Sequence, residues 1–402
     1  MIANFSVSNY RSIKNLQSIS FVATSDKTNR ELDTQEVAKG IFINKLAIFL
    51  GPNASGKSNI LLALQAVISL MSKPCGSKRD VIPNYIPFGM IDERPCTMSL
   101  DFFIEGIRYF YDLEFNRKEI MKESLYYVPS RSKALIYARE FVGEDKQPKI
   151  SYGTTTRLFL STKDALREHT YNNSTVLSTV SKLSLRDDAD ILKKILSWAE
   201  TRVILIDNGL PNSGYASELQ KIDTDKDKRD LLIKLLRKAD FNITDFRIVK
   251  EESQEGGNIN VLFTNRSDEG AFDTPLELQS EGTLRFIELS DILYNVSKEN
   301  YVYLVDELGN KLHYELIVYY LRLFLFGSES SQIFFTTQSL LLLDEDFIRY
   351  DTVYLTEKEP VSASTIYERV SDLKLRKGGS LYKWYRIGKL GSIPEVGSPY
   401  VQ

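Results

Sequence analysis

The strongest hydrophobic pattern lies between residues 45 and 71. Lys45–Leu50 is an almost continuous apolar run, which is typical of a buried parallel strand. A polar, glycine-containing stretch follows at 51–58, and apolar positions then recur with helical spacing from Asn59 to Met71. This pattern predicts a strand that passes through a tight loop directly into a helix.

The N-terminal part, up to about residue 150, shows mainly the two-residue alternation of strands. Ile2–Val7 predicts a strand, and Thr97–Glu105 and Arg108–Phe115 predict a hairpin that turns at Glu105-Gly106. Thr24–Gly40 is polar and predicts a loop.

Helical spacing follows from about 155 to 239, with an apolar break at Val203–Ile206. Phe246–Glu251 and Asn258–Asn265 then predict a second hairpin around Gly256-Gly257, and strands and helices alternate again from Leu276. We therefore expect three segments: an N-terminal lobe at 1–150, a mainly helical insertion at 151–245 and a C-terminal lobe at 246–402.

The composition is that of an ordinary globular chain. Its 402 residues include 51 Lys and Arg and 54 Asp and Glu, a net charge of −3, which argues against a generally basic nucleic-acid binder but allows a local basic patch. Cys75 and Cys96 lack the spacing of a zinc site. Because no signal peptide and no apolar run of membrane-spanning length is visible, we expect a cytoplasmic protein that does not enter a membrane.

The stretch 51–58 matches the pattern G-x-x-x-x-G-K-[ST], with a strand before it and a helix after it. We expect Gly51 and Gly56 to adopt positive φ and to keep side chains away from phosphates. Amides at a helix N-terminus favour anions, Lys57 can bridge the β- and γ-phosphates, and the Ser58 hydroxyl can ligate Mg²⁺. The sequence therefore predicts a site for ATP and Mg²⁺, with the nucleotide bound by Gly51, Pro52, Asn53, Ala54, Ser55, Gly56, Lys57, Ser58 and Asn59.

Two later apolar strands end in polar residues that can complete this site. Tyr301–Val305 runs into Asp306, which can hold Mg²⁺, and Glu307, which can act as general base toward an attacking water. Ser331–Thr337 runs into Gln338, which can contact the γ-phosphate or the water, or can simply cap the strand end.

Ser280 and Gly282 precede an apolar helix that we expect at Leu284–Val296. A helix N-terminus with a hydroxyl and a glycine can form a second phosphate site. The alternative is an ordinary helix in which Ser280 is the N-cap.

The order of these motifs resembles that of ABC-type ATPase heads of the SMC, RecF and OLD kind. The opening Phe5–Ser12 looks like their first strand, which implies that Arg11 contributes to the nucleotide site. The ending Trp384–Pro394 is similar to that of ATP-binding proteins of bacterial abortive-infection and anti-phage systems, such as the ATPase subunits of RloA- and PARIS-like pairs.

Three features depart from that resemblance. Gln338 stands where the switch histidine is usual, and the signature motif is Ser280-Glu281-Gly282 in place of Ser-Gly-Gly. An Asp that often follows the Asp-Glu pair is absent from Leu308–Tyr314, while His313 matches the family position or simply begins a helix.

The resemblance implies an α/β fold, a P-loop ABC-type ATPase head whose mixed sheet carries an antiparallel β subdomain, with a helical insertion. It also implies a head-to-tail homodimer in which the site of one subunit faces Ser280 and Gly282 of the other. The preferred function is an ATP-hydrolysing sensor and scaffold of an anti-phage system. A phage component would be the trigger, and the effector would be a separate protein such as a nuclease, because the 64 residues after Gln338 (339–402) are too few for a Toprim domain. The alternatives are an ATPase that acts on DNA in repair or chromosome maintenance, and a transporter ATPase.

The C-terminal segment Arg369–Lys389 combines cations with aromatic residues and contains one acid, Asp372. Such a composition suits nucleic acid, a partner protein, or simple packing of the aromatic residues onto the head. The cations and aromatic residues concerned are Arg369, Lys374, Arg376, Lys377, Tyr382, Lys383, Trp384, Tyr385, Arg386 and Lys389.

Overall fold

The computed structural model describes residues 1–91, 94–144, 146–206, 212–239, 241–250, 259–373, 375 and 379–391. The chain forms two compact units. Unit 1 comprises Met1–Leu205, Tyr301–Asp306 and Ser330–Gln402, and unit 2 comprises Ile206–Asn300 and Glu307–Glu329. The boundaries differ from those of the three predicted segments, because the helical segment 151–245 contributes to both units.

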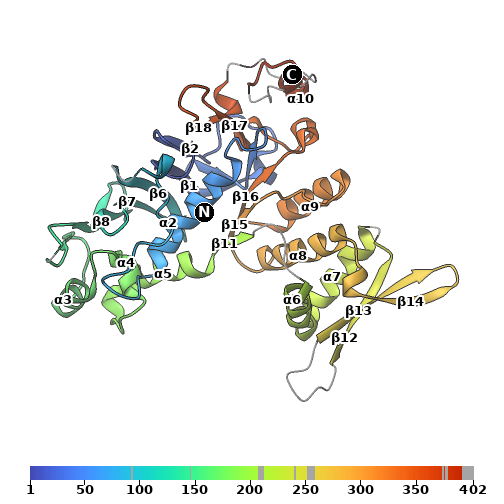
Figure 1. The fold of residues 1–402 in the computed structure, drawn as a ribbon, viewed down its shortest axis with the longest axis horizontal. Coiled ribbons are helices and arrows are strands. Elements are labelled where there is room, and N and C mark those ends of the chain that lie inside the picture. The colour runs from blue at the N-terminus through green and yellow to red at the C-terminus, as the bar shows by residue number, and fades with distance from the viewer. Residues whose placement is uncertain are drawn as a thin grey trace, which may run out of the picture. The chain divides into compact units, whose positions relative to one another are not determined.

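A six-stranded sheet lies at the centre of unit 1 (Figure 1). Its spatial order is β11 (Val203–Ile206), β15 (Val302–Val305), β16 (Gln332–Thr337), β5 (Leu46–Leu50), β17 (Val353–Lys358) and β18 (Thr365–Arg369). The strands β15, β16, β5 and β17 are parallel, and β18 is antiparallel to β17. The carboxyl ends of the parallel strands therefore share one edge, which is where open α/β sheets bind ligands.

The second sheet of unit 1 has seven antiparallel strands. In spatial order these are β10 (Lys149–Tyr152), β9 (Ala134–Glu140), β8 (Ile120–Val128), β7 (Ile107–Phe115), β6 (Cys96–Ile104), β1 (Ile2–Ser8) and β2 (Gln17–Ser20). The strand predicted at Ile2–Val7 and the hairpin of β6 and β7 are confirmed. Positions along β1 and β7 alternate between buried and partly exposed, as expected for a sheet with one face against a core.

Helices of unit 1 pack against both sheets. The helix predicted after the glycine-containing loop is α2 (Lys57–Ser72), and α3 (Leu160–His169), α4 (Val176–Val180) and α5 (Asp190–Thr201) follow. One core cluster joins apolar residues of both sheets to α2 and α5, and Phe102 of β6 stacks on Trp198 of α5 with ring centroids 4.6 Å apart. These helices therefore belong to the unit 1 core, since their apolar faces are buried there.

The loop predicted at Thr24–Gly40 is wrong in part. It contains α1 (Arg30–Asp33) and β3 (Thr34–Ala38), which pairs with β4 (Ile41–Asn44) through a turn at Gly40, where φ is 76°. This short hairpin was not predicted because Gln35 and Glu36 of β3 are polar and not buried, so the strand lacks the alternation of apolar and polar residues.

Unit 2 combines helices with a small antiparallel sheet of order β12-β13-β14. Its elements are α6 (Asn212–Thr224), α7 (Lys226–Lys238), β12 (Ile243–Lys250), β13 (Ile259–Ser267), β14 (Gly270–Pro275), α8 (Glu281–Val296) and α9 (Tyr314–Gly327). The predicted β12–β13 hairpin is confirmed, although its turn at Gly256-Gly257 lies outside the described residues. The strand β14 was not predicted, because Gly270, Asp273 and Pro275 disfavour strands.

Short turns of helix complete the fold: η1 (Phe88–Met90), η2 (Asp187–Ala189), η3 (Leu276–Leu278), η4 (Leu340–Asp344), η5 (Tyr350–Thr352), η6 (Val370–Asp372) and α10 (Leu381–Arg386). Within the described ranges, the helices are all too short or too polar to cross a membrane.

Candidate functional site

The predicted phosphate loop connects β5 to α2 and has the conformation of an anion cradle. Gly56 immediately precedes the helix with φ +104°, and no side chain caps α2 there. The first amides of α2 are therefore not occupied by a capping side chain, and they carry the positive end of the helix dipole. A Cβ on Gly56 would clash with Thr365 Oγ1 and would lie 2.8 Å from Ser12 Oγ, so this position requires glycine for space as well as for φ.

The expectation of positive φ at Gly51 is wrong. The positive-φ residues of this loop are Gly56 and Ala54, whose φ is 61°. Gly51 is needed for a different reason: a Cβ there would collide with the backbone carbonyl of Thr356 in β17. The first glycine thus lets a neighbouring strand approach the loop, while the second allows the turn into the helix.

Lys57 is turned onto the loop that precedes it. Its side chain is buried, and Nζ donates to the carbonyl oxygens of Gly51 at 3.0 Å and Pro52 at 2.9 Å. The ammonium group is therefore held over the loop, while Asn53 and Ala54 at its tip are exposed.

Asp306 lies where β15 ends and receives two hydroxyl groups on one oxygen. Ser58 Oγ donates to Asp306 Oδ1 at 2.7 Å, and Thr336 Oγ1 of β16 donates to the same oxygen at 2.6 Å. Gln338 follows β16 at the same edge of the sheet and is exposed. The structure therefore brings together the loop, Asp306 and the end of β16, as the sequence predicted.

Residues behind the loop were not identified from the sequence. Thr365 Oγ1 donates to the carbonyl of Ser55 at 2.8 Å, and the phenolic hydroxyl of Tyr367, also in β18, donates to the carbonyl of Gly56 at 2.8 Å. Ser12 Oγ accepts from Asn59 Nδ2 at 2.5 Å. The register of β18 brings Thr365 and Tyr367 to the loop, and the turn after β1 brings Ser12, so no local sequence signal could reveal these contacts.

Arg11 lies in the turn that also carries Ser12, and this turn contacts the loop through Ser12. Its φ is 51°, its amide donates to Ile86 O at 2.7 Å, and its guanidinium carbon is 5.8 Å from the ring centroid of Tyr10. Arg11 Nε is buried and has no hydrogen-bond partner. The turn therefore lies beside the phosphate loop, and the contribution of Arg11 to the nucleotide site stays a prediction.

Ser280, Gly282 and Glu307 belong to unit 2. Ser280 is the N-cap of α8, and its Oγ accepts from Thr283 N at 3.0 Å. A Cβ on Gly282 would lie 2.7 Å from the carbonyl oxygen of Lys311, whose Nζ is 3.1 Å from Glu281 Oε1. The capping hypothesis for Ser280 is confirmed, and Gly282 permits a close backbone approach.

Glu307 follows Asp306 with φ 48° and is half-buried, and its carbonyl accepts from Asn310 N at 2.9 Å. His313 caps α9, because its Nδ1 accepts from Glu315 N at 3.3 Å. The helix-start interpretation of His313 is therefore confirmed.

The residues of the loop fit a nucleotide with Mg²⁺. The helix amides after Gly56 have no capping side chain and can bind phosphates, and Ser58 and Asp306 supply the hard oxygen ligands that Mg²⁺ prefers. Within the described ranges, no three His, Cys, Asp or Glu residues cluster as an alternative metal site.

The C-terminal segment packs partly onto unit 1. Arg369 donates to the carbonyl oxygens of Asp351 and Val22, Tyr385 is buried, and Trp384 lies against Tyr350 with ring centroids 6.4 Å apart. Lys383, Arg386 and Lys389 are exposed, whereas Lys374, Arg376 and Lys377 lie outside the described residues, as does the end of Trp384–Pro394 from Ser392 on.

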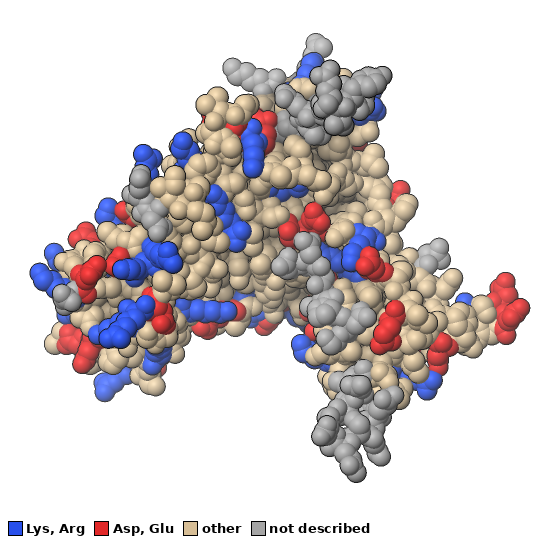
Figure 2. Space-filling view, in the orientation of Figure 1, with Lys and Arg blue, Asp and Glu red and all other residues tan. Residues whose placement is uncertain are grey.

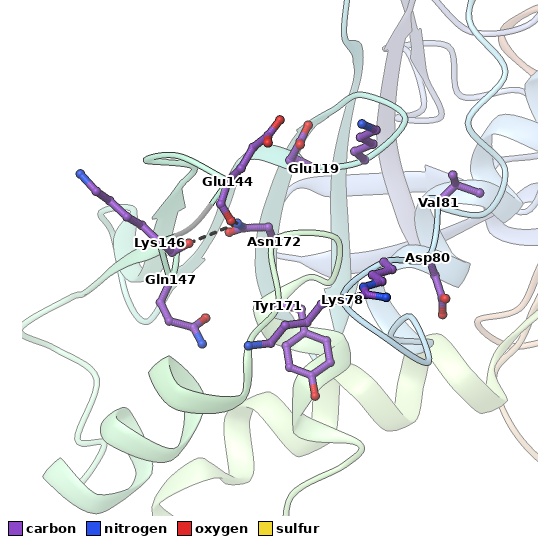
Figure 3. A pocket seen from close by; sticks show the side chains of 11 residues that line it. Lys78, Asp80, Val81, Glu119, Glu144, Lys146, Gln147, Tyr171 and Asn172 are labelled. Carbon is purple, nitrogen blue, oxygen red and sulfur yellow. Dashed lines mark hydrogen bonds between the residues drawn. The ribbon is translucent and has the colours of Figure 1, made fainter.

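A separate hollow of about 550 Å³ lies elsewhere on unit 1 (Figure 3). Tyr171 and Asn172 form part of its lining, and Asn172 Nδ2 donates to Lys146 O at 3.1 Å. The buried Arg139 donates to the carbonyl of Asn172 at 2.9 Å, and Glu123 lies close to Arg139 in the same interior. The charged lining mixes cations and acids, so its charge selects no ligand class: Lys78, Arg79, Asp80, Lys118, Glu119, Glu144 and Lys146.

The glycine loop joins a parallel strand to a helix, and its Ser58 is hydrogen-bonded to Asp306 at the end of the parallel strand β15. This arrangement defines the fold of a P-loop nucleoside triphosphatase, here with an ABC-type head. A family model described as "AAA domain, putative AbiEii toxin, Type IV TA system" matches residues 46–344, well over half of the chain. The chain belongs to this family, whose P-loop fold implies nucleotide binding.

Three of the solved structures that match the chain are heads of SMC proteins. The SMC head domain from Thermotoga maritima is 12% identical with a TM-score of 0.41, covering 92% of this chain and 98% of that one. An SMC head bound to the C-winged helix domain of ScpA is 12% identical (TM-score 0.43; 91% and 97% covered). The head with an extended coiled coil from Pyrococcus furiosus, bound to the C-terminal domain of ScpA, is 10% identical (TM-score 0.39; 97% and 98%). No curated protein matches the chain.

Proposed function

We propose that the chain binds and hydrolyses ATP and thereby controls a separate effector protein of a bacterial defence system. The observation that carries the ATP part is the shared hydrogen bonding of Ser58 and Thr336 to Asp306 Oδ1 at the edge of the parallel sheet. A hydroxyl from the phosphate loop and a carboxylate from a neighbouring strand are the protein ligands of Mg²⁺ in P-loop enzymes.

Each predicted residue has a role in this proposal. The loop amides from Gly51 to Ser58, with Lys57, would bind the phosphates, and Mg²⁺ on Ser58 and Asp306 would neutralise charge on the transferred phosphoryl group. Glu307 would accept a proton from the attacking water, and Gln338 would orient that water. Arg11 would add positive charge at the edge of the site. Asn59 would hold the turn that carries Arg11, through its hydrogen bond to Ser12.

The proposed active assembly is a head-to-tail homodimer. Ser280 and Gly282 of a second copy would contact the γ-phosphate, since a helix N-terminus favours an anion. Two observations support this role: Ser280 is exposed, and Gly282 has no Cβ, which lets the carbonyl oxygen of Lys311 lie close to the start of α8.

Control of a separate effector is supported by the family. Its description names a toxin and a toxin–antitoxin system, and the C-terminal segment resembles ATPases of abortive-infection pairs. In such a pair, one polypeptide senses the trigger and hydrolyses ATP, while the other, the effector, harms the cell when it is released. The net charge of −3 favours this proposal over an ATPase that binds DNA by itself.

The test variant is Lys57→Ala. The control is Lys73→Ala, which also removes one lysine, but an exposed one at the opposite end of α2. We expect wild type and Lys73→Ala to bind and hydrolyse ATP, and Lys57→Ala to keep the fold and lose both. Each form is then expressed with the product of the neighbouring reading frame, and its effect on growth is measured. Normal turnover by Lys57→Ala would refute the site, and growth that never depends on Lys57 would refute effector control.

A further inference from the structure

The strand β14 forms a free edge of the unit 2 sheet. The order is β12-β13-β14, and within the described ranges β14 pairs with β13 alone, from Leu262↔Pro275 to Ser267↔Gly270. The pairing has no bulge, and Gly270 to Asp273 are all exposed. A straight strand with an open side therefore presents unpaired backbone groups to solvent.

The position of Pro275 shows which groups point outward. Hydrogen-bonded and non-bonded pairs alternate along an antiparallel ladder, and proline has no N–H to donate, so Leu262↔Pro275 is a non-bonded pair. Ala271 and Asp273 have the same parity as Pro275. Their N–H and C=O groups therefore face away from β13 and are available to another strand.

This edge lacks most of the usual protection against pairing, because the charged residue within the strand, Asp273, is paired with Arg247. Natural edges are commonly blocked by lysine, a bulge or a proline within the strand. The stretch 267–280 contains no lysine, arginine or histidine, and Pro275 stands only at its end. Phe272 is 53% exposed and Leu278 74% exposed, so apolar surface accompanies the open backbone.

The charge along the same stretch is acidic. Asp273 is paired with Arg247, whose Nη2 is 2.5 Å from its carboxylate, while Asp268, Glu269 and Glu277 are exposed. Figure 2 shows acidic side chains gathered at the tip of the β13–β14 arm, on the right of the view. An occupant of complementary charge is basic.

We propose that an extended basic segment of a partner polypeptide binds along β14 as a fourth strand of this sheet. The backbone groups of Ala271 and Asp273 supply the hydrogen bonds, Phe272 supplies apolar contact, and the exposed acids select lysine or arginine in the partner. We take this partner to be the effector, and only that part of the proposal rests on the proposed function.

The edge is joined to the start of the signature helix. Thr274 Oγ1 accepts from Asn265 Nδ2 at 2.7 Å and from Gln279 Nε2 at 2.6 Å, and Gln279 immediately precedes Ser280, the N-cap of α8. A strand bound at β14 therefore restrains the residue next to the proposed phosphate contact. The same surface can thus report whether a partner is present.

The test uses a fluorescent peptide, Lys-Val-Thr-Val-Lys-Val-Thr-Lys, and the same peptide N-methylated at alternate residues, with the full chain. We expect the first peptide to bind and the methylated one to bind at least about tenfold more weakly, since two or more hydrogen bonds are lost. Ala271→Pro, which removes one outward N–H at an exposed edge position, is expected to lose binding by a similar factor. Ala271→Val, which keeps that N–H, is the matched control.

Equal binding of both peptides, or no binding of the first below about 1 mM, would overturn the proposal. So would equal binding by Ala271→Pro and Ala271→Val when both are folded. If Ala271→Pro fails to fold, the peptide comparison decides alone. ATP turnover is measured on the same samples. If wild type hydrolyses ATP but binds no peptide, only the proposal about the β14 edge is refuted. If wild type binds the peptide but hydrolyses no ATP, only the ATPase proposal is refuted.

Discussion

Ser58 Oγ and Asp306 Oδ1 lie 2.7 Å apart although 248 positions separate them in the chain. Thr336 donates to the same carboxylate oxygen, so two hydroxyl groups fix the carboxylate at the edge of the sheet. A metal ligand held in this way has little conformational freedom to lose when a metal binds, which favours binding.

Glu307→Gln should bind ATP with little change and hydrolyse it about 10²–10⁴ times more slowly, because the amide cannot accept a proton. Single-turnover hydrolysis and nucleotide affinity are the measurements. Glu315→Gln, at an exposed position of α9, is the control and should behave as wild type. Unchanged turnover in Glu307→Gln would assign the proton to another group.

Ser280→Arg should leave ATP binding to a single subunit almost unchanged and stop hydrolysis, since a bulky cation would block closure of the proposed dimer. Mixing Ser280→Arg with Lys57→Ala should restore at most one site per dimer. The measurements are turnover in the mixture and molecular mass with and without ATP. If neither responds to mixing or to ATP, the head-to-tail dimer is wrong.

Gly56→Ala should impair nucleotide binding and destabilise the fold more than Gly40→Ala does. Both glycines have positive φ, +104° and +76°, which costs an alanine of order 1 kcal/mol. A Cβ at Gly40 meets nothing within 4 Å, whereas one at Gly56 meets Thr365 and Ser12. The difference in free energy of unfolding between the two variants, expected to be about 1–3 kcal/mol, measures the crowding. Equal losses would show that only the backbone angle matters.

Asp33→Asn should change how stability depends on pH. Burial raises the pKa of Asp33 to about 7, even though Arg349 and Lys45 oppose this shift, and both carboxylate oxygens are buried without a hydrogen-bond partner. A raised pKa means that the folded state holds its proton more tightly than the unfolded state. This stabilises the fold below about pH 4, and the stabilisation is lost as pH rises through about 7.

The variant has no such titration. Relative to wild type, Asp33→Asn should therefore gain stability between about pH 4 and 7, on the order of 2–4 kcal/mol, because each unit of pKa change corresponds to about 1.4 kcal/mol. The measurement is the difference in unfolding free energy between wild type and variant across this range. A difference that stays constant with pH would place the Asp33 pKa near its ordinary value.

The features that the sequence predicted correctly depend on residues close together in the chain. The strand, loop and helix around Lys57 form one continuous stretch with strict chemistry, and the ends of β15 and β16 are visible because buried parallel strands are uniformly apolar. The cap at Ser280 was predicted for the same reason, since an N-cap is a local interaction.

What the sequence missed depends on contacts between distant segments. Glycine is needed at position 51 because a Cβ there would collide with the carbonyl of Thr356. Thr365 and Tyr367 support the loop through hydrogen bonds to its carbonyl groups. These contacts form only when β17 and β18 have joined the sheet. The strand β14 escaped prediction because its alternation is broken by residues that suit turns, and pairing with β13 overrides that local preference.

The support given to the phosphate loop by β18 has a consequence for the newly made chain. Thr365 bonds to Ser55 across 310 positions, so the loop leaves the ribosome long before the residues that hold it. At about 5–20 residues per second, the interval is roughly 15–60 s. During that time β5 and α2 are present without their backing, and a chain interrupted before Thr365 would carry the complete phosphate-binding motif but not the scaffold that shapes it. Competence to use a nucleotide is therefore acquired only after Thr365 has been added to the chain.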